Sequence, residues 1–413
     1  MKSISSAFLC ILMFIACGNQ VKNSGLFHQG KESIIIAVNT SHSIGYFVDS
    51  EGTFLFNKQF ERVWSFSEGL APIRQNDKWG FINTQGEVVI PCIYDDTRWF
   101  SEGLARVEQN DKWGYINTKG EVIAPCIYDG VNDFKEGLAR VEQNDKWGFI
   151  NTQGEVVIPC IYDYADDFSE GLAPVNQNGK YGFITPQGEV VIPCIYHWAA
   201  WRFSEGLAYV KQNGKYGFIN TKGEVVVPCI YDHAWSFSEG LACVKQNDKW
   251  GYINTKGEVV IPCIYDWAER FSKGLARVVQ NGKYGFINTQ GEVVITCIYD
   301  GATWFSEGLA YVEQNGKYGF INPQGEVVIP CIYDDAWWFS EGLARVEQND
   351  KWGYINTKGW VVVPCIYDWA ENFKEGLARV KQNGKYSIIN KEGKVIVAEC
   401  DEWNTSWSKV EME

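Results

Sequence analysis

The chain has 413 residues, of which 46% are hydrophobic, and it carries a formal net charge of −14. That hydrophobic fraction is enough for a continuous buried core and excludes a disordered chain. The negative charge excludes the basic face that nucleic-acid-binding proteins need, so no nucleic-acid partner is expected.

The first predicted element, residues 1–16, has the pattern of an export signal. Lys2 precedes an apolar run from Ala7 to Ala16, which is too short to cross a bilayer as a helix. With Cys17, this segment resembles a bacterial lipoprotein signal peptide, in which the cysteine becomes the lipidated first residue. The resemblance implies an exported protein anchored by lipid to a bacterial membrane, with the outer membrane or cell surface favoured. An ordinary secretory signal and an uncleaved anchor are the alternatives.

A tandem repeat dominates the rest of the chain. Residues 17–43 are polar at first and are predicted to form a tether leading into a first, degenerate unit. Each later unit is 34 residues long and contains the motif Lys-Trp/Tyr-Gly, with one spacing of 35 between Gly182 and Gly217. The motif glycines are Gly80, Gly114, Gly148, Gly182, Gly217, Gly251, Gly285, Gly319 and Gly353. A fixed period of this size predicts stacked supersecondary units.

The residues of one repeat predict strands rather than helices. Residues 104–109 alternate between apolar and polar, as a half-buried strand does. The Asn-Asp pair that follows, which is Asn-Gly in other copies, predicts a tight hairpin turn into residues 112–116. The third strand, 121–128, contains Pro125, which removes a ladder donor and predicts a bend or a sheet edge. Each repeat is thus predicted to be a three-stranded antiparallel meander plus a connector.

The motif resembles the WG-repeat family, also described as KWG repeats, over about residues 44–398. The resemblance implies an all-β repeat array and no catalytic activity. We expect about eleven units, nine of them clear, followed by a tail or cap at 399–413. The short unit and the high copy number favour an open β-solenoid or superhelix, and a β-propeller-like closed ring is the alternative.

Nine of the 13 cysteines occupy one column of the repeat: Cys92, Cys126, Cys160, Cys194, Cys229, Cys263, Cys297, Cys331 and Cys365. Equivalent positions in neighbouring repeats, separated by three strands, would lie about 14 Å apart. A disulfide needs Cα atoms within about 7 Å, so we expect reduced, buried thiols. The four histidines follow no repeat. No metal site and no cofactor are therefore expected.

The connector before each Phe-Ser-Glu-Gly segment varies in sequence and contains the single inserted residue, as a surface loop does. Ten of the 18 tryptophans lie in these connectors. They either fill the groove between neighbouring repeats or form an exposed aromatic ladder that binds a ligand. The candidate ligand-binding residues are Trp99, Trp198, Trp201, Arg202, Trp235, Trp267, Trp304, Trp337, Trp338 and Trp369.

The favoured function is a non-enzymatic, lipid-anchored envelope protein whose extended surface binds a protein or polysaccharide of the cell envelope. Repetition supports this hypothesis, because many weak contacts add to a useful avidity. A purely structural spacer is the alternative. A hydrolase that uses carboxylates is less favoured, because the recurring acids, such as Asp95 and Glu102, fit turns and solvated faces better than a catalytic site.

Overall fold

The computed structural model describes residues 32–39, 44–56, 58–200, 202–400 and 406–411. The predicted signal segment and the predicted lipidation site, Cys17, lie outside these residues. The chain divides into two compact units, one formed by Met1–Ile93 with Ile396–Glu413 and the other by Tyr94–Val395. Among the described residues, no helix is long and apolar enough to cross a membrane.

Each repeat forms a four-stranded antiparallel sheet, which we call a blade, with its strands in chain order. The first strands are β3 (Arg62–Val63), β7 (Asp96–Thr97), β11 (Gly130–Val131), β15 (Tyr164–Ala165), β19 (Trp198–Ala199), β23 (His233–Ala234), β27 (Trp267–Ala268), β31 (Gly301–Ala302), β35 (Asp335–Ala336) and β39 (Trp369–Ala370). The second strands are β4 (Leu70–Gln75), β8 (Leu104–Gln109), β12 (Leu138–Gln143), β16 (Ala173–Gln177), β20 (Leu207–Gln212), β24 (Leu241–Gln246), β28 (Leu275–Gln280), β32 (Ala310–Gln314), β36 (Leu343–Gln348) and β40 (Leu377–Gln382).

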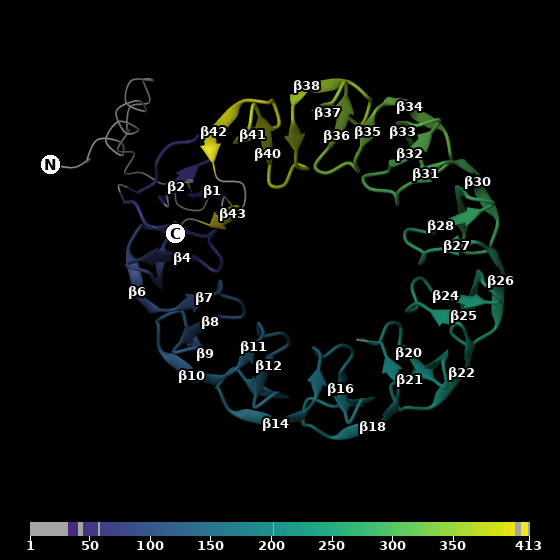
Figure 1. Ribbon diagram of the computed structural model, residues 1–413, viewed down its shortest axis with the longest axis horizontal. Helices are drawn as coiled ribbons and strands as arrows, with labels where there is room; N and C mark the ends of the chain where they lie inside the picture. The colour runs from purple at the N-terminus through teal and green to yellow at the C-terminus, as the bar shows by residue number, and fades with distance from the viewer. Residues whose placement is uncertain (1–31, 40–43, 57, 201, 401–405, 412–413) are drawn as a thin grey trace. The chain divides into compact units, whose positions relative to one another are not determined.

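The remaining strands complete the blades. The third strands are β5 (Lys78–Asn83), β9 (Lys112–Asn117), β13 (Lys146–Asn151), β17 (Lys180–Ile184), β21 (Lys215–Asn220), β25 (Lys249–Asn254), β29 (Lys283–Asn288), β33 (Lys317–Ile321), β37 (Lys351–Asn356) and β41 (Lys385–Asn390). The fourth strands are β6 (Val88–Tyr94), β10 (Val122–Tyr128), β14 (Val156–Tyr162), β18 (Val190–Tyr196), β22 (Val225–Tyr231), β26 (Val259–Tyr265), β30 (Val293–Tyr299), β34 (Val327–Tyr333), β38 (Val361–Tyr367) and β42 (Val395–Cys400). Within Tyr94–Val395 the blades follow one another along an arc, with the fourth strands on its convex side (Figure 1).

The prediction of a three-stranded unit was wrong, because the connector supplies a strand of its own. Asp96 and Thr97 pair with Glu108 and Val107 of β8. The flanking amide of Arg98 donates to the carbonyl of Arg106 at 3.0 Å. A strand of two residues is too short to show the alternation by which longer strands are recognised.

The ends of the chain share a further sheet inside the first unit. β1 (Glu32–Asn39) pairs with both β2 (Gly45–Asp49) and β43 (Ser406–Glu411), in the order β2-β1-β43. β1 falls in the predicted tether and β43 in the predicted tail. Tandem four-stranded blades, with strands from both chain ends in one sheet, are the architecture of a β-propeller. The all-β repeat is therefore confirmed, and its form is the expected alternative rather than the favoured open solenoid.

Local geometry explains the hairpin and its glycine. Asn110 and Asp111 have positive φ values of 54° and 59°, which confirms the predicted tight turn between β8 and β9. A Cβ on Gly114 would lie 2.5 Å from the carbonyl oxygen of Ala124 and 2.8 Å from the amide nitrogen of Cys126. The motif glycine is thus required because the irregular fourth strand lies directly against it.

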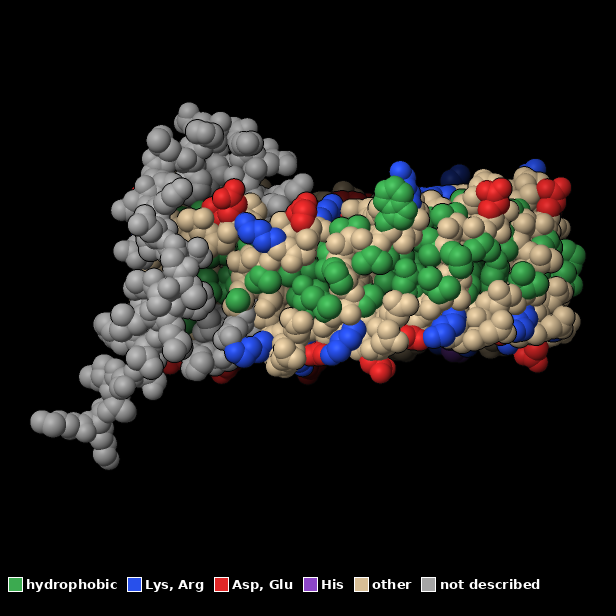
Figure 2. All heavy atoms as spheres, turned by 90° about the horizontal axis from the view of Figure 1, so that it is seen from above, with side chains coloured by type: hydrophobic (Ala, Val, Ile, Leu, Met, Phe, Trp, Pro, Cys, Tyr) green, Lys and Arg blue, Asp and Glu red, His purple; other side chains and the backbone are tan. Residues whose placement is uncertain are grey.

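The fourth strand lies at the edge of each blade, as the proline found in most copies, such as Pro125, predicts. Its first valine and its later isoleucine are exposed; Val122 is 63% exposed and Ile127 45%. On the face drawn in Figure 2, hydrophobic side chains form a band with charged side chains on both sides. Pro125 lacks an N–H at this edge, which disfavours pairing with the edge of another chain.

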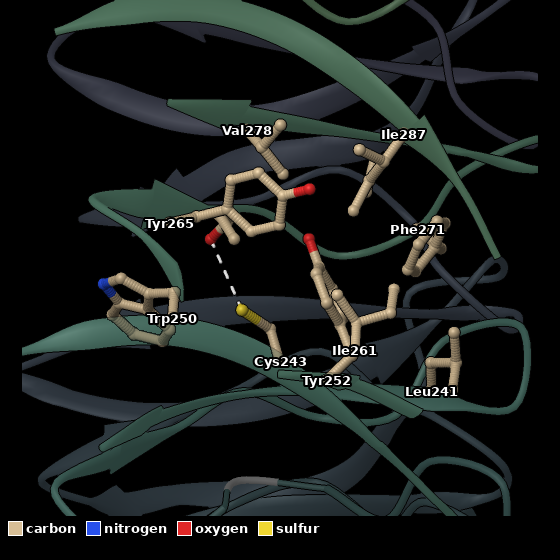
Figure 3. Close-up of a cluster of buried hydrophobic side chains, with 11 residues drawn as sticks. Leu241, Cys243, Trp250, Tyr252, Ile261, Tyr265, Phe271, Val278 and Ile287 are labelled. Carbon is tan, nitrogen blue, oxygen red and sulfur yellow. Dashed lines mark hydrogen bonds between the residues drawn. The ribbon is translucent and has the colours of Figure 1, made fainter. Parts of the chain in front are cut away.

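The core lies between consecutive blades. In the cluster of Figure 3, Leu241 and Trp250 come from one blade, and Phe271, Val278 and Ile287 come from the next. Polar contacts add to this packing. Oε2 of Glu102 accepts a hydrogen bond from the amide of Gly137, one repeat later, at 3.2 Å. Each blade therefore depends on its neighbour for both apolar burial and hydrogen bonding.

The nine column cysteines are free thiols, and they are half-buried rather than fully buried. The Sγ of Cys126 donates to the carbonyl of Val107 at 3.6 Å, and Cys365 does the same to Val346 at 3.7 Å. Burial raises the pKa of both thiols. These cysteines act as small packing residues. No cluster of three metal-ligating side chains occurs among the described residues.

Candidate ligand-binding site

The connector tryptophans occupy three different positions around the first strand of a blade. The first residue of that strand is tryptophan at Trp198, Trp267 and Trp369. The position after the strand is tryptophan at Trp235 and Trp337, and the next position holds Trp99, Trp304 and Trp338. They therefore do not form one ladder. The candidate Trp201 lies outside the described residues, and Arg202 is exposed.

None of the described connector tryptophans is buried. Trp304 is 53% exposed, Trp99 48% and Trp267 42%, whereas the alanine that follows the first-strand tryptophan, such as Ala268, is completely buried. The small residue thus points into the core between blades, and the aromatic rings lie at the surface. Their exposure favours the interpretation of a contact surface over that of a filled groove.

One group of tryptophans spans two blades. The ring centroids of Trp304 and Trp338 lie 5.8 Å apart, and those of Trp337 and Trp338 lie 4.9 Å apart. The guanidinium of Arg345 lies 4.1 Å from the centroid of Trp337, in range for a cation–π contact. We call Trp304, Trp337 and Trp338 the tryptophan cluster. It presents a broad, partly apolar surface next to the positively charged guanidinium of Arg345.

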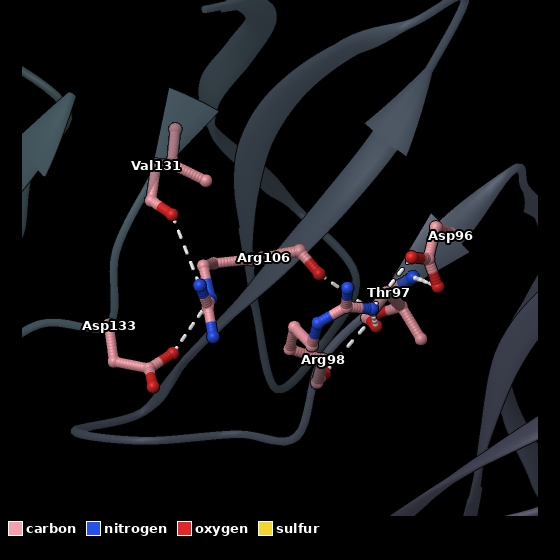
Figure 4. Close-up of polar contacts among 6 residues, drawn as sticks. All are labelled: Asp96, Thr97, Arg98, Arg106, Val131 and Asp133. Carbon is pink, nitrogen blue, oxygen red and sulfur yellow. Dashed lines mark hydrogen bonds and ion pairs between the residues drawn. The ribbon is translucent and has the colours of Figure 1, made fainter. Parts of the chain in front are cut away.

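The variable arginines beside the connectors link blades. In Figure 4, the Nη1 of Arg106 donates to the carbonyl of Val131 in the next blade at 3.1 Å. Its Nε forms an ion pair with Asp133 at 2.8 Å, and the Arg106 side chain is only 19% exposed. In the copy with Cys243, the thiol donates instead to the equivalent carbonyl of Ala268 at 3.5 Å. This column therefore contributes to stability rather than extending the exposed surface.

The recurring carboxylates also have structural partners. Asp129, which follows β10, binds the ammonium of Lys112. Its other oxygen accepts the amide N–H of Asn144, in the hairpin turn of the next blade, at 2.9 Å. The lysine hydrogen bond, and then that amide, hold the pKa of Asp129 below its ordinary value. These contacts give the recurring aspartates a structural role between blades.

A single blade, β19–β22, breaks this pattern, because His197 stands where the other copies have a carboxylate. The backbone is conserved: the His197 amide donates to the carbonyl of Lys211 at 3.0 Å, as Asp129 does to Glu142 at 2.9 Å. An open surface hollow of about 470 Å³ lies here. Its lining residues are His197, Trp198, Lys211, Asn213, Gly214 and Tyr216.

Of the residues that line this hollow, the sequence analysis predicts only Trp198 as a ligand-binding residue. Two signals mark the place. His197 interrupts the aspartate column, and the same connector contains the single inserted residue of the array. A smaller hollow brings Arg202 together with Asp166 and Asp167 of the preceding blade and with Arg140 of the blade before that. The candidate residues thus separate into several surroundings: the hollow at His197, the smaller hollow at Arg202, the tryptophan cluster and the other connector rings. Among these last rings, Trp235, Trp267 and Trp369 each contact a neighbouring aromatic ring.

Comparisons with known proteins agree with the repeat. The family model of the WG containing repeat matches ten consecutive segments that together cover residues 47–386. No curated protein matches the sequence.

Solved structures that resemble the chain share little sequence with it. A crystal structure of the eukaryotic initiation factor is 11% identical, with a TM-score of 0.45, and the match covers 92% of this chain and 98% of that one. Citrobacter koseri AztD is 10% identical, with a TM-score of 0.31, over 92% of this chain and 99% of that one. These scores are too low to carry an argument. The family match covers most of the sequence, and the chain belongs to the WG-repeat family.

Proposed function

We propose that this protein is a non-enzymatic, lipid-anchored protein of the bacterial cell envelope that binds a protein or polysaccharide through its connector surface. The observation that carries the proposal is the tryptophan cluster. Trp304 and Trp338 come from consecutive blades, lie 5.8 Å apart and are not buried. Exposed aromatic rings are poorly solvated by water, so their contact with an apolar or ring-shaped partner is favourable.

The distribution of the polar groups supports a binding protein over an enzyme. The recurring aspartates, glutamates and arginines form contacts between blades, as Asp129, Glu102 and Arg106 do. What varies between repeats is the connector. Several different aromatic contacts on one rigid scaffold suit an extended ligand, because weak contacts on a shared polymer combine.

The binding test applies the wild-type protein and a double variant, Trp304→Ala with Trp338→Ala, to glycan arrays and to envelope-protein arrays. We expect the double variant to lose binding and to keep the melting temperature of the wild type. Trp360→Ala is the matched control, because Trp360 is 66% exposed but lies in the turn before β38 rather than in a connector. Unchanged binding by the double variant, or no ligand on either array, would contradict the proposal in favour of a structural spacer.

The anchor is tested separately at Cys17. Bacteria that express the chain are grown with a labelled fatty acid, and the membrane and soluble fractions are compared. We expect label on the wild-type protein in the membrane fraction and neither label nor membrane retention for Cys17→Ser. A Cys92→Ser variant controls for labelling of other thiols, since Cys92 lies in the repeat column. A labelled Cys17→Ser variant would rule out lipidation at this residue.

A further inference from the structure

The hairpin turns between second and third strands follow one rule with one exception. In the other blades of the described chain, a carboxylate accepts the amide N–H of the turn asparagine. The accepting residues are Glu61, Asp95, Asp129, Asp163, Asp232, Asp266, Asp300, Asp334 and Asp368. For the turn at Asn213 and Gly214, the corresponding residue is His197, which never carries a negative charge.

The same substitution leaves a lysine without its usual counter-charge. Lysines of the third strands bind the aspartate 17 residues later, as Lys146 binds Asp163 and Lys215 binds Asp232. Lys180 stands 17 residues before His197 and has no carboxylate there. Lys211 adds a second cation, because it occupies the position that is Glu108 or Glu142 in other blades. The substitution thus leaves excess positive charge around His197, together with turn N–H groups that no carboxylate among the described residues accepts.

Aromatic rings flank this positive region. Trp198 is 37% exposed, and its ring centroid lies 5.5 Å from that of Tyr181 in the preceding blade. On the other side, the Nζ of Lys211 lies 5.0 Å from the centroid of Tyr216, which in turn contacts His233 at 5.1 Å. A ligand in the hollow therefore meets the rings of Trp198 and Tyr216, both from the blade β19–β22, as well as cationic and N–H donors.

We propose that the hollow at His197 binds a uronic acid unit of an acidic polysaccharide. Its carboxylate takes the place that an aspartate holds in other blades, between the turn N–H groups of Asn213 and Gly214 and the lysine side chains. The apolar face of its sugar ring stacks on Trp198 or Tyr216. This inference rests on the proposed binding function and names the ligand class for one site.

A sugar acid fits these observations better than an acidic peptide. A uronic acid carries its carboxylate on a compact ring with an apolar face, so one residue satisfies both the cations and the aromatic rings. Further exposed rings lie on the following blades, where Trp235 is 37% exposed and Trp267 42%. Rings in succession suit a polymer of repeating sugar rings.

The test is a calorimetric titration of the full-length protein with an oligogalacturonate and with its methyl ester, which keeps the rings but removes the charge. We expect binding of the acid form and about fivefold weaker binding of the ester, since an exposed charge contact is worth roughly 1 kcal/mol. His197→Asp restores the residue of the other repeats, so it is expected to fold normally and to weaken binding by at least about tenfold.

A pair of tryptophan variants completes the experiment. Trp198→Ala is expected to weaken binding, whereas Trp360→Ala is not, because Trp360 is 66% exposed but lies in no connector and does not line the hollow. Equal binding by wild type and His197→Asp would overturn the proposal, as would binding of polyglutamate in place of the oligosaccharide. If no oligogalacturonate binds while an array ligand still depends on Trp304 and Trp338, the inference fails and the proposed function stands.

Discussion

Arg140 donates from Nη1 to the carbonyl oxygen of Ala165, one blade further along the chain, at 2.7 Å.. The same guanidinium lies 3.0 Å from Asp166, and the arginine side chain is 14% exposed. Ala165 is buried between blades, where a carbonyl without a donor would be costly. Arginine supplies this donor in several repeats and Cys243 in another, so in these copies the column has a packing role.

Removal of this arginine should therefore destabilise the protein. Arg140→Ala leaves the carbonyl of Ala165 without its donor and Asp166 without its cation, at a cost of about 1–3 kcal/mol. The measurement is a urea denaturation curve followed by far-ultraviolet circular dichroism. Arg202→Ala is the control, since Arg202 is exposed, and should leave the midpoint unchanged. Equal midpoints for the two variants would show that the contact at Arg140 is not stabilising.

Two glycines separate the effect of space from that of backbone conformation. Gly114→Ala places a Cβ 2.5 Å from a backbone oxygen, so the fourth strand must move, and we expect a loss of about 3 kcal/mol or more. In Gly103→Ala the new Cβ has no other atom within 4 Å. The backbone keeps φ at +77°, however, which costs an alanine roughly 1–2 kcal/mol. Both losses of stability are measured by urea denaturation. A larger loss for Gly103→Ala would contradict the role assigned to the motif glycine.

The parts of the fold that depend on neighbouring residues could be predicted from the sequence, and those that depend on the next repeat could not. The hairpin at Asn110 and the edge position of Pro125 follow from turn geometry and from a missing donor. The strand Asp96–Thr97 was missed because two residues show no alternation. The contact between Glu102 and Gly137 joins residues 35 apart and depends on how blades stack.

The candidate site was predictable to a similar degree. Concentration of tryptophan in the connectors identified the variable surface, and the described rings are at least partly exposed. Sequence alone could not separate the tryptophan cluster from the hollow at His197, because that requires knowing which connector positions face which neighbour. The departure of His197 from the aspartate column was visible, but its meaning required the hydrogen bonds that the aspartates make.

Thiol reactivity should differ between the column cysteines and Cys243. Burial raises the pKa of both kinds of thiol, but Cys243 is only 1% exposed, while Cys126 is half-buried. With iodoacetamide at pH 8 and mass spectrometry, we expect Cys243 to react at least about tenfold more slowly than Cys126. In urea the rates should converge. Equal rates in the folded protein would mean that the blade interface around Cys243 opens readily.

Acid should destabilise the protein through the aspartates that follow the fourth strands. Hydrogen bonding to Lys112 and Lys146 lowers the pKa of Asp129 and of Asp163. A carboxylate whose pKa is lower in the folded state stabilises the fold above its unfolded pKa, about 3.9 for aspartate, and that stability is lost as pH falls through the folded value. We expect the melting temperature to fall most steeply below about pH 4, and the fall to be smaller at high salt.

The variant that checks this cause combines Asp129→Asn with Asp163→Asn. It should melt below the wild type at pH 7, and the difference should shrink as pH falls to 3, because protonation removes the same charges from the wild type. Asp111→Asn is the control, since it removes a carboxylate from a hairpin turn without removing the partner of either lysine. A difference between the double variant and the wild type that stays constant from pH 7 to pH 3 would exclude these ion pairs as the source of the acid sensitivity.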